Sequence, residues 1–146
     1  MPGIIVGVDG SGHSKRALEW AIKEAAIRHA PLTVLTVHQA VAGYYSRVAN
    51  YSEDPELTEK AREAAQTETD KMLAGLGDSR PESVTVKAVH GFPVEELIKA
   101  ASDADMIVLG SRGAGGFTRL LMGSVASQVA QHAHCPVLIV PPEDGS

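Results

Sequence analysis

The sequence of 146 residues lacks several features that would each indicate a particular class of protein. It has a single cysteine, Cys135, so no disulfide can form within the chain and nothing favours an oxidising compartment. Basic residues are in the minority, since 13 lysines and arginines against 18 aspartates and glutamates give a formal net charge of −5. Nucleic acids select basic surfaces, so this balance argues against a nucleic acid as the main partner.

The chain also lacks a long hydrophobic run and the pattern of a signal segment. No apolar stretch approaches the roughly 20 residues that a membrane-spanning helix needs. The first residues lead directly into a strand pattern, without the charged and apolar regions of a secretory signal. We therefore expect a cytoplasmic protein with no membrane partner, and the length predicts one domain over residues 1–146.

Two common nucleotide-binding fingerprints are missing as well. No G-x-x-x-x-G-K-[ST] occurs, and residues 10–15 (G-S-G-H-S-K) only imitate it. No G-x-G-x-x-G follows the first predicted strand. A P-loop NTPase and an ordinary dinucleotide dehydrogenase are therefore both disfavoured.

The hydrophobic pattern predicts five strands that alternate with four helices. Short apolar runs predict strands, and apolar residues at helical spacing predict helices. The strands are expected at residues 4–8, 32–37, 83–89, 105–109 and 136–140, and the helices at residues 14–28, 55–76, 94–102 and 124–133. Such alternation implies an α/β fold, in which helices cover both faces of a parallel sheet. The stretch between residues 38 and 54 predicts a long loop that is either functional or mobile, and a ligand or a partner are the two candidates for what its three tyrosines cover.

The most informative stretch follows the fourth predicted strand, where a glycine-rich loop leads into a helix start. Gly110 and Gly113 keep side chains away from an approaching ligand. The N–H groups of Ser124 and Val125, at the helix start, suit a phosphate, and the Ser124 hydroxyl adds a donor. Arg112 offers a fork of donors to an oxyanion. The alternative is a flexible connection that ends in a helix cap.

Asp9 stands directly after the first predicted strand, at the edge where parallel sheets bind ligands. Its carboxylate can accept hydrogen bonds from ribose hydroxyls or help to hold a divalent ion. The alternative is a residue that forms an Asx turn. His38, after the second strand, lies near the same edge, although a plain loop histidine explains it equally well. Cys135 is expected to be a small buried hydrophobe, not a redox group.

Five segments of the sequence together resemble one family, the universal stress proteins. They are I-V-G-V-D-G-S (5–11), S-K-R-A-L-E-W-A (14–21), D-M-I-V-L-G-S-R-G (105–113), L-L-M-G-S-V (120–125) and H-C-P-V-L-I-V (134–140). The nucleotide-binding branch of this family is marked by G-x2-G-x9-G-[S/T]. Gly110, Gly113, Gly123 and Ser124 match that pattern in full, and the resemblance covers nearly the whole chain.

The resemblance implies a Rossmann-like fold, with an open parallel sheet of five strands in the order 3-2-1-4-5. It also implies ATP, or ADP or AMP, between the ends of the first and fourth strands. By this likeness Asp9 faces the ribose or a magnesium ion, and Val37 offers its backbone to the adenine. The other residues implied at ribose and phosphates are Gly110, Arg112, Gly113, Gly123, Ser124 and Val125.

Two further expectations come from the same resemblance. Family members often carry a hydroxyl residue where this chain has Ala126. The lack of this hydroxyl would weaken the binding of phosphate or shift the preference toward AMP or ADP. Family members usually dimerise through the last strand. The sequence is compatible with this, because Val137–Val140 would be an apolar edge that needs covering.

The motifs and the resemblance together predict an adenine-nucleotide-binding stress-response protein that acts as a homodimeric sensor or regulator. No obvious general base accompanies the phosphate-binding residues, so we do not expect a dedicated enzyme, and at most slow ATP hydrolysis. Two alternatives stay open. One is an adenylyl-transfer or hydrolytic enzyme of the adenine-nucleotide α/β class, and the other is a dimerisation module without nucleotide.

Overall fold

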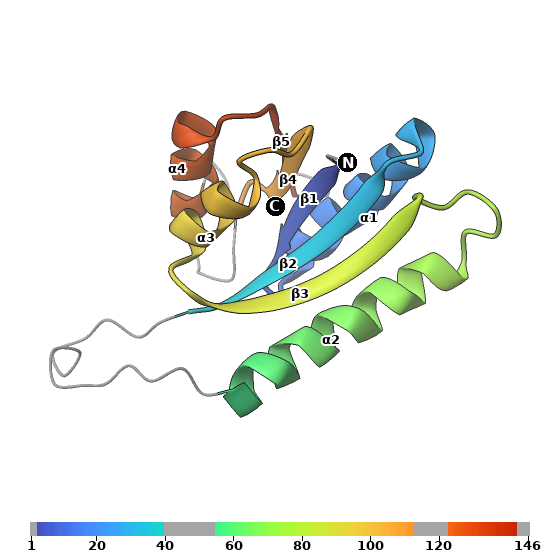
Figure 1. Ribbon diagram of the computed structural model, residues 1–146, viewed down its shortest axis with the longest axis horizontal. Coiled ribbons are helices and arrows are strands. Elements are labelled where there is room, and N and C mark those ends of the chain that lie inside the picture. The colour runs from blue at the N-terminus through green and yellow to red at the C-terminus, as the bar shows by residue number, and fades with distance from the viewer. Residues whose placement is uncertain (1–2, 40–54, 113–122, 143–146) are drawn as a thin grey trace, which may run out of the picture.

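The computed structural model describes residues 3–39, 55–112 and 123–142. Their secondary structure alternates between strands and helices, as predicted (Figure 1). The elements are β1 (Ile4–Val8), α1 (Gly12–Arg28), β2 (Pro31–Gln39), α2 (Pro55–Ala74), β3 (Ser83–Gly91), α3 (Pro93–Ala100), β4 (Met106–Gly110), α4 (Ser124–His132) and β5 (Val137–Val140). None of the helices in these ranges is long and apolar enough to cross a membrane.

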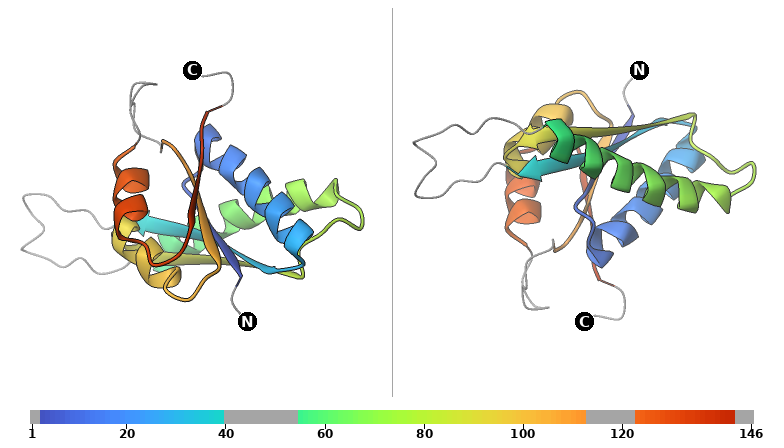
Figure 2. Two further views of the ribbon diagram at one scale, coloured as in Figure 1. Left: turned by 90° about the horizontal axis from the view of Figure 1, so that it is seen from above. Right: turned by 90° about the horizontal axis from the view of Figure 1, so that it is seen from below.

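The strands form a single parallel sheet in the order β3-β2-β1-β4-β5. This confirms the predicted α/β fold class and strand order. Helices cover both faces, with α1 and α2 on one side of the sheet and α3 and α4 on the other (Figure 2). Because both faces are covered, the central strands are apolar on both sides, which is the pattern that predicted a parallel sheet.

Each face of the sheet carries its own hydrophobic core. Under α1 and α2, the side chains of Val6, Leu18 and Val34 are completely buried. Under α3 and α4, Ile107 and Val129 are likewise inaccessible. The two cores hold the helices against the sheet, so the carboxyl ends of the strands form a rigid edge between the two layers.

Two strands are longer than the hydrophobic pattern predicted. β2 and β3 pair with each other as far as Gln39 and Gly91, whereas the sequence placed their ends at residues 37 and 89. His38 therefore belongs to a strand, and its interpretation as a plain loop histidine is wrong. The apolar pattern fades before the strands end because their last residues lie at the rim of the sheet, where ladder pairing persists without full burial.

The other boundaries agree with the predicted ones to within two residues. α1 begins at Gly12, two residues before its predicted start, and Ser11 is its N-cap. Most of the tyrosine-bearing loop, residues 40–54, and Gly113 of the glycine-rich stretch lie outside the described residues.

Candidate functional site

The strands part at the carboxyl end of β1, where the strand order reverses. β1 is paired with β4 only as far as Val6, and with β2 up to its last residue, Val8. β2 continues past β1 through Val37, His38 and Gln39, which pair with β3 alone. We call these three residues the β2 overhang. Open α/β sheets bind their ligands at such a switch point.

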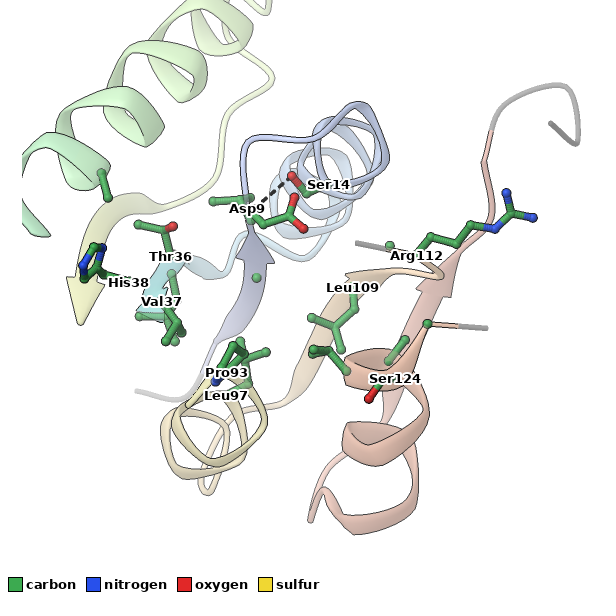
Figure 3. Close-up of a pocket in the computed structure, with 18 residues that line it drawn as sticks. Asp9, Ser14, Thr36, Val37, His38, Pro93, Leu97, Leu109, Arg112 and Ser124 are labelled. Atoms are coloured by element: carbon green, nitrogen blue, oxygen red, sulfur yellow. Dashed lines mark hydrogen bonds between the residues drawn. The ribbon is translucent and has the colours of Figure 1, made fainter. Parts of the chain in front are cut away.

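A cavity of about 510 Å³ occupies this crevice (Figure 3). It is lined by the ends of β1, β2 and β4 and by residues from all four described helices. Its size suits a ligand as large as a nucleotide. Seven of the eight residues that the sequence nominated line it: Asp9, Val37, Gly110, Arg112, Gly123, Ser124 and Val125.

Sequence reasoning missed several lining residues that no motif marks. Thr36 and Leu35 precede the β2 overhang, and Pro93 and Leu97 come from α3. The β2 residues could have been found from the sequence, because they lie at the end of a predicted strand, where such sheets bind ligands. The α3 residues carried no signal of their own, because their place at the cavity depends on how α3 packs across the sheet.

Asp9 has a structural role at the start of α1. Its Oδ1 accepts hydrogen bonds from the Ser11 N–H at 2.9 Å and from the Ser11 hydroxyl at 2.6 Å. The Ser11 Oγ in turn accepts the Ser14 N–H at 3.2 Å, so the protein caps this helix itself. The Asx turn that the sequence left open is therefore present. Among the described residues both hydrogen bonds to the carboxylate go to Oδ1, and Asp9 lines the cavity.

The start of α4 differs from that of α1, because within the described ranges no side-chain cap is found at its N-terminus. The N-cap is Gly123, and the first bond of the helix runs from the Ser127 N–H to the Gly123 carbonyl at 2.9 Å. The N–H groups of Ser124, Val125 and Ala126 precede this bond and lie at the cavity. Uncapped N–H groups at a helix N-terminus attract anions, so this end of the cavity suits a phosphate.

Backbone hydrogen bonds fix α4 beside the sheet. The Gly123 N–H donates to the Ser111 carbonyl at 2.6 Å, and the Ser111 N–H donates to the Val140 carbonyl at 2.9 Å. The first bond brings the two halves of the G-x2-G-x9-G-S pattern together. The uncapped end of α4 is thereby held at the carboxyl end of β4.

Gly110 is required by packing. A Cβ at this position would stand 2.9 Å from the carbonyl oxygen of His13 and 3.2 Å from that of Arg112. Both neighbours are backbone atoms, which do not move aside as a flexible side chain would. The glycine pattern predicted a role for Gly110 in ligand approach alone, whereas the structure adds the close contact between β4 and the first turn of α1.

Arg112 does not aim its guanidinium into the cavity in this structure. The residue is only 7% exposed, and its side chain points away from Asp9 and Ser124 (Figure 3). Arg112 still contributes to the lining. Its predicted contact with phosphate would need a different side-chain rotamer and stays a prediction.

Of the two serine hydroxyls on α4, the one on Ser124 belongs to a residue that lines the cavity in the described structure and the one on Ser127 does not. The Ser124 Oγ accepts a hydrogen bond from the Gln128 side-chain amide at 3.0 Å, which leaves the hydroxyl proton for another acceptor. Ala126 is buried and lines the cavity, whereas Ser127 is not among its described lining residues. Ser127 therefore does not supply the hydroxyl that the family resemblance implied at position 126.

No metal centre is formed by side chains alone in the part of the chain that the structure describes. Those residues contain no group of three or more His, Cys, Asp or Glu side chains that could hold a metal ion. A divalent ion near Asp9 would therefore need further ligands from phosphate oxygens and water, as is usual for Mg²⁺.

Cys135, just before β5, is expected to react slowly with thiol reagents at neutral pH. Burial raises the pKa of its thiol, the Asp105 carboxylate raises it further, and a backbone hydrogen bond with Ile107 opposes them. The thiolate is the reactive form, so alkylation by iodoacetamide at pH 7.5 should run more slowly than for a model cysteine peptide. The rate should still rise with pH where the peptide has levelled off. A rate equal to that of the peptide would contradict this prediction.

Comparisons with known proteins give the family. A model of the universal stress protein family matches residues 2–141. The universal stress protein Rv2005c of Mycobacterium tuberculosis is 33% identical over 148 residues, which cover 97% of this chain and 48% of that protein. A universal stress protein of Mycolicibacterium smegmatis is 34% identical over 147 residues, with 97% and 49% covered. The chain thus spans about half the length of these relatives.

Solved structures agree with this. UspA from Lactobacillus plantarum superposes with a TM-score of 0.71 at 27% identity, over 95% of this chain and 97% of that one. A universal stress protein in complex with cAMP superposes with a TM-score of 0.66 at 25% identity, over 96% of each chain. The sheet order, the cavity at the end of β1 and the match over nearly the whole sequence lead to one conclusion: the chain belongs to the universal stress protein family.

Proposed function

We propose that this protein binds an adenine nucleotide and acts as a homodimeric sensor or regulator, not as a dedicated enzyme. The observation that carries the proposal is the polarity of the cavity. One end is the N-terminus of α4 at Ser124, where the described residues provide no side-chain cap, and the other carries the apolar side chains of Val37 in the β2 overhang and Leu97 of α3. A nucleoside phosphate is divided in the same way, with an anion at one end and a planar aromatic base at the other.

This polarity sets the orientation of the nucleotide. Phosphate oxygens would accept hydrogen bonds from the N–H groups of Ser124 and Val125, and the α4 dipole would add electrostatic attraction. The ribose would lie near Asp9, whose Oδ2 can accept its hydroxyl protons. The base would then reach the β2 overhang, which β1 no longer covers, and there bind the backbone N–H or carbonyl of Val37.

Ala126 favours a nucleotide with few phosphates. Each additional phosphate adds charge that the α4 N-terminus must neutralise, and position 126 supplies no hydroxyl for it. The relative solved with cAMP, a monophosphate, supports the same choice. We therefore expect AMP and ADP to bind at least as well as ATP. Any magnesium ion would be held through phosphate oxygens and water, with Asp9 nearby.

The homodimer would form through β5. This strand is the edge of the sheet, and its Val137, Leu138 and Ile139 are only partly buried within one chain. An apolar edge strand is a template for pairing with another copy. We also propose that residues 1–146 act as one domain of this kind and that the protein works in the cytoplasm.

Isothermal titration calorimetry with AMP, ADP, ATP, adenosine and GMP tests the proposed function. We expect AMP and ADP to bind more tightly than adenosine, which lacks phosphate, and more tightly than GMP, which has another base. Absence of binding by every adenine nucleotide would contradict the proposal. Chromatography of ATP incubations separates the enzyme alternative, because turnover in the usual enzymatic range of about 1–1000 per second would rule out a plain regulator.

A further inference from the structure

His38 lines the cavity and packs against the imidazole of His90. It is the middle residue of the β2 overhang and lines the cavity, together with Ala61 of α2 (Figure 3). His90 of β3 is its direct register partner. The two ring centroids are 5.6 Å apart and their planes are inclined by 34°, a spacing typical of packed aromatic rings. His90 therefore braces the His38 ring on the side away from β1.

Alternation along β2 fixes which face of the sheet this ring occupies. Leu35 and Val37 pack into the core beneath α3 and α4, while Val34 packs into the core beneath α1. Successive side chains of a strand point to opposite faces, so Thr36 and His38 turn toward α1 and α2. Val37 and His38 thus flank the β2 overhang from the two faces of the sheet.

A planar base bound to the edge of the overhang would lie between these two side chains. Hydrogen bonds to a strand edge run roughly in the plane of the sheet, so a purine that makes them continues that plane. One face of the purine then turns toward Val37 and Leu97, and the other toward the side of His38. The imidazole of His38 lines the cavity and can offer a π-face to such a base, while His90 packs against the ring from the side of β3.

We propose that His38, braced by His90, is a stacking wall for the purine base and thereby a base-binding residue of the cavity. This inference rests on the proposed function, because it requires a nucleotide whose phosphate lies at α4. His38 would touch the base directly. His90 would act through His38 and is a positioning residue.

Imidazole NMR of the unmodified protein tests the proposal without any variant. On titration with AMP, the ring current of a stacked purine should move the carbon-bound ring protons of His38 upfield. Ribose 5-phosphate, which has no base, should leave those protons in place while it shifts the amides of Ser124 and Val125. His134, exposed and just before β5, is the internal control and should not respond to either ligand.

Calorimetry of variants gives the size of the effect. His38→Ala should weaken AMP binding about fivefold and His38→Phe should restore it, because the aromatic face is what matters. His90→Ala should weaken AMP binding less and reduce the upfield shift of His38. All three should bind ribose 5-phosphate as the unmodified protein does, and His134→Ala should match it throughout.

The outcomes separate this inference from the proposed function. If AMP binds while the His38 ring protons stay in place, or His38→Ala binds AMP with full affinity, the stacking wall is wrong and the nucleotide site stands. If the unmodified protein binds neither AMP nor ribose 5-phosphate, both proposals fail together.

Discussion

Ser124→Asp is expected to weaken AMP binding by about 50-fold while leaving the fold at least as stable as before. The substitution removes a hydroxyl donor and places a carboxylate where the phosphate would accept hydrogen bonds, at a cost of about 2–3 kcal/mol in binding. The same carboxylate interacts favourably with the α4 dipole, worth about 0.3–1 kcal/mol of stability. Calorimetry with AMP and adenosine, together with thermal unfolding, measures both effects, and adenosine binding should barely change.

Ser127→Asp is the matched control. It adds the same charge one turn along α4, at a residue that does not line the cavity in the described structure. We expect its AMP affinity to change by no more than about threefold, since partly solvated charges at this separation interact weakly. If Ser124→Asp binds AMP as tightly as Ser127→Asp does, the phosphate does not lie at the start of α4.

Gly110→Ala is expected to lower the free energy of unfolding by about 2–3 kcal/mol, even without nucleotide. The added methyl group would meet the carbonyl oxygens of His13 and Arg112 at 2.9 and 3.2 Å, so β4 and the first turn of α1 must move apart. For a chain of this size the melting temperature should fall by roughly 5–10 °C. Urea and thermal unfolding of the nucleotide-free protein measure the loss.

Gly12→Ala provides the comparison, because a Cβ there would have no neighbour within 4 Å. It lies at the start of α1, where alanine favours the helix, so stability should be unchanged or rise by up to about 1 kcal/mol. Should Gly110→Ala unfold like Gly12→Ala and lose only nucleotide affinity, the glycine would serve the ligand alone. The explanation that Gly110 is needed because no Cβ fits between β4 and α1 would then be wrong.

The sequence by itself was sufficient for the fold class and for the position of the site along the chain. Apolar runs and helical spacing are local patterns, and they predicted each element to within two residues at most boundaries. The glycine pattern and its resemblance to the universal stress proteins nominated Asp9, Gly123 and Ser124. The structure brings all three to one cavity, although Asp9 is far from the other two in the chain.

Only the tertiary structure decided how those residues are arranged. The length of the β2 overhang and the pairing of His38 with His90 depend on register between strands, which no local pattern encodes. The contact of Gly110 with the His13 carbonyl likewise depends on how closely a helix approaches the sheet. Spacing along a sequence reports which groups can bind a ligand. Distances between segments remote in sequence, set by packing of the two cores, decide where those groups point.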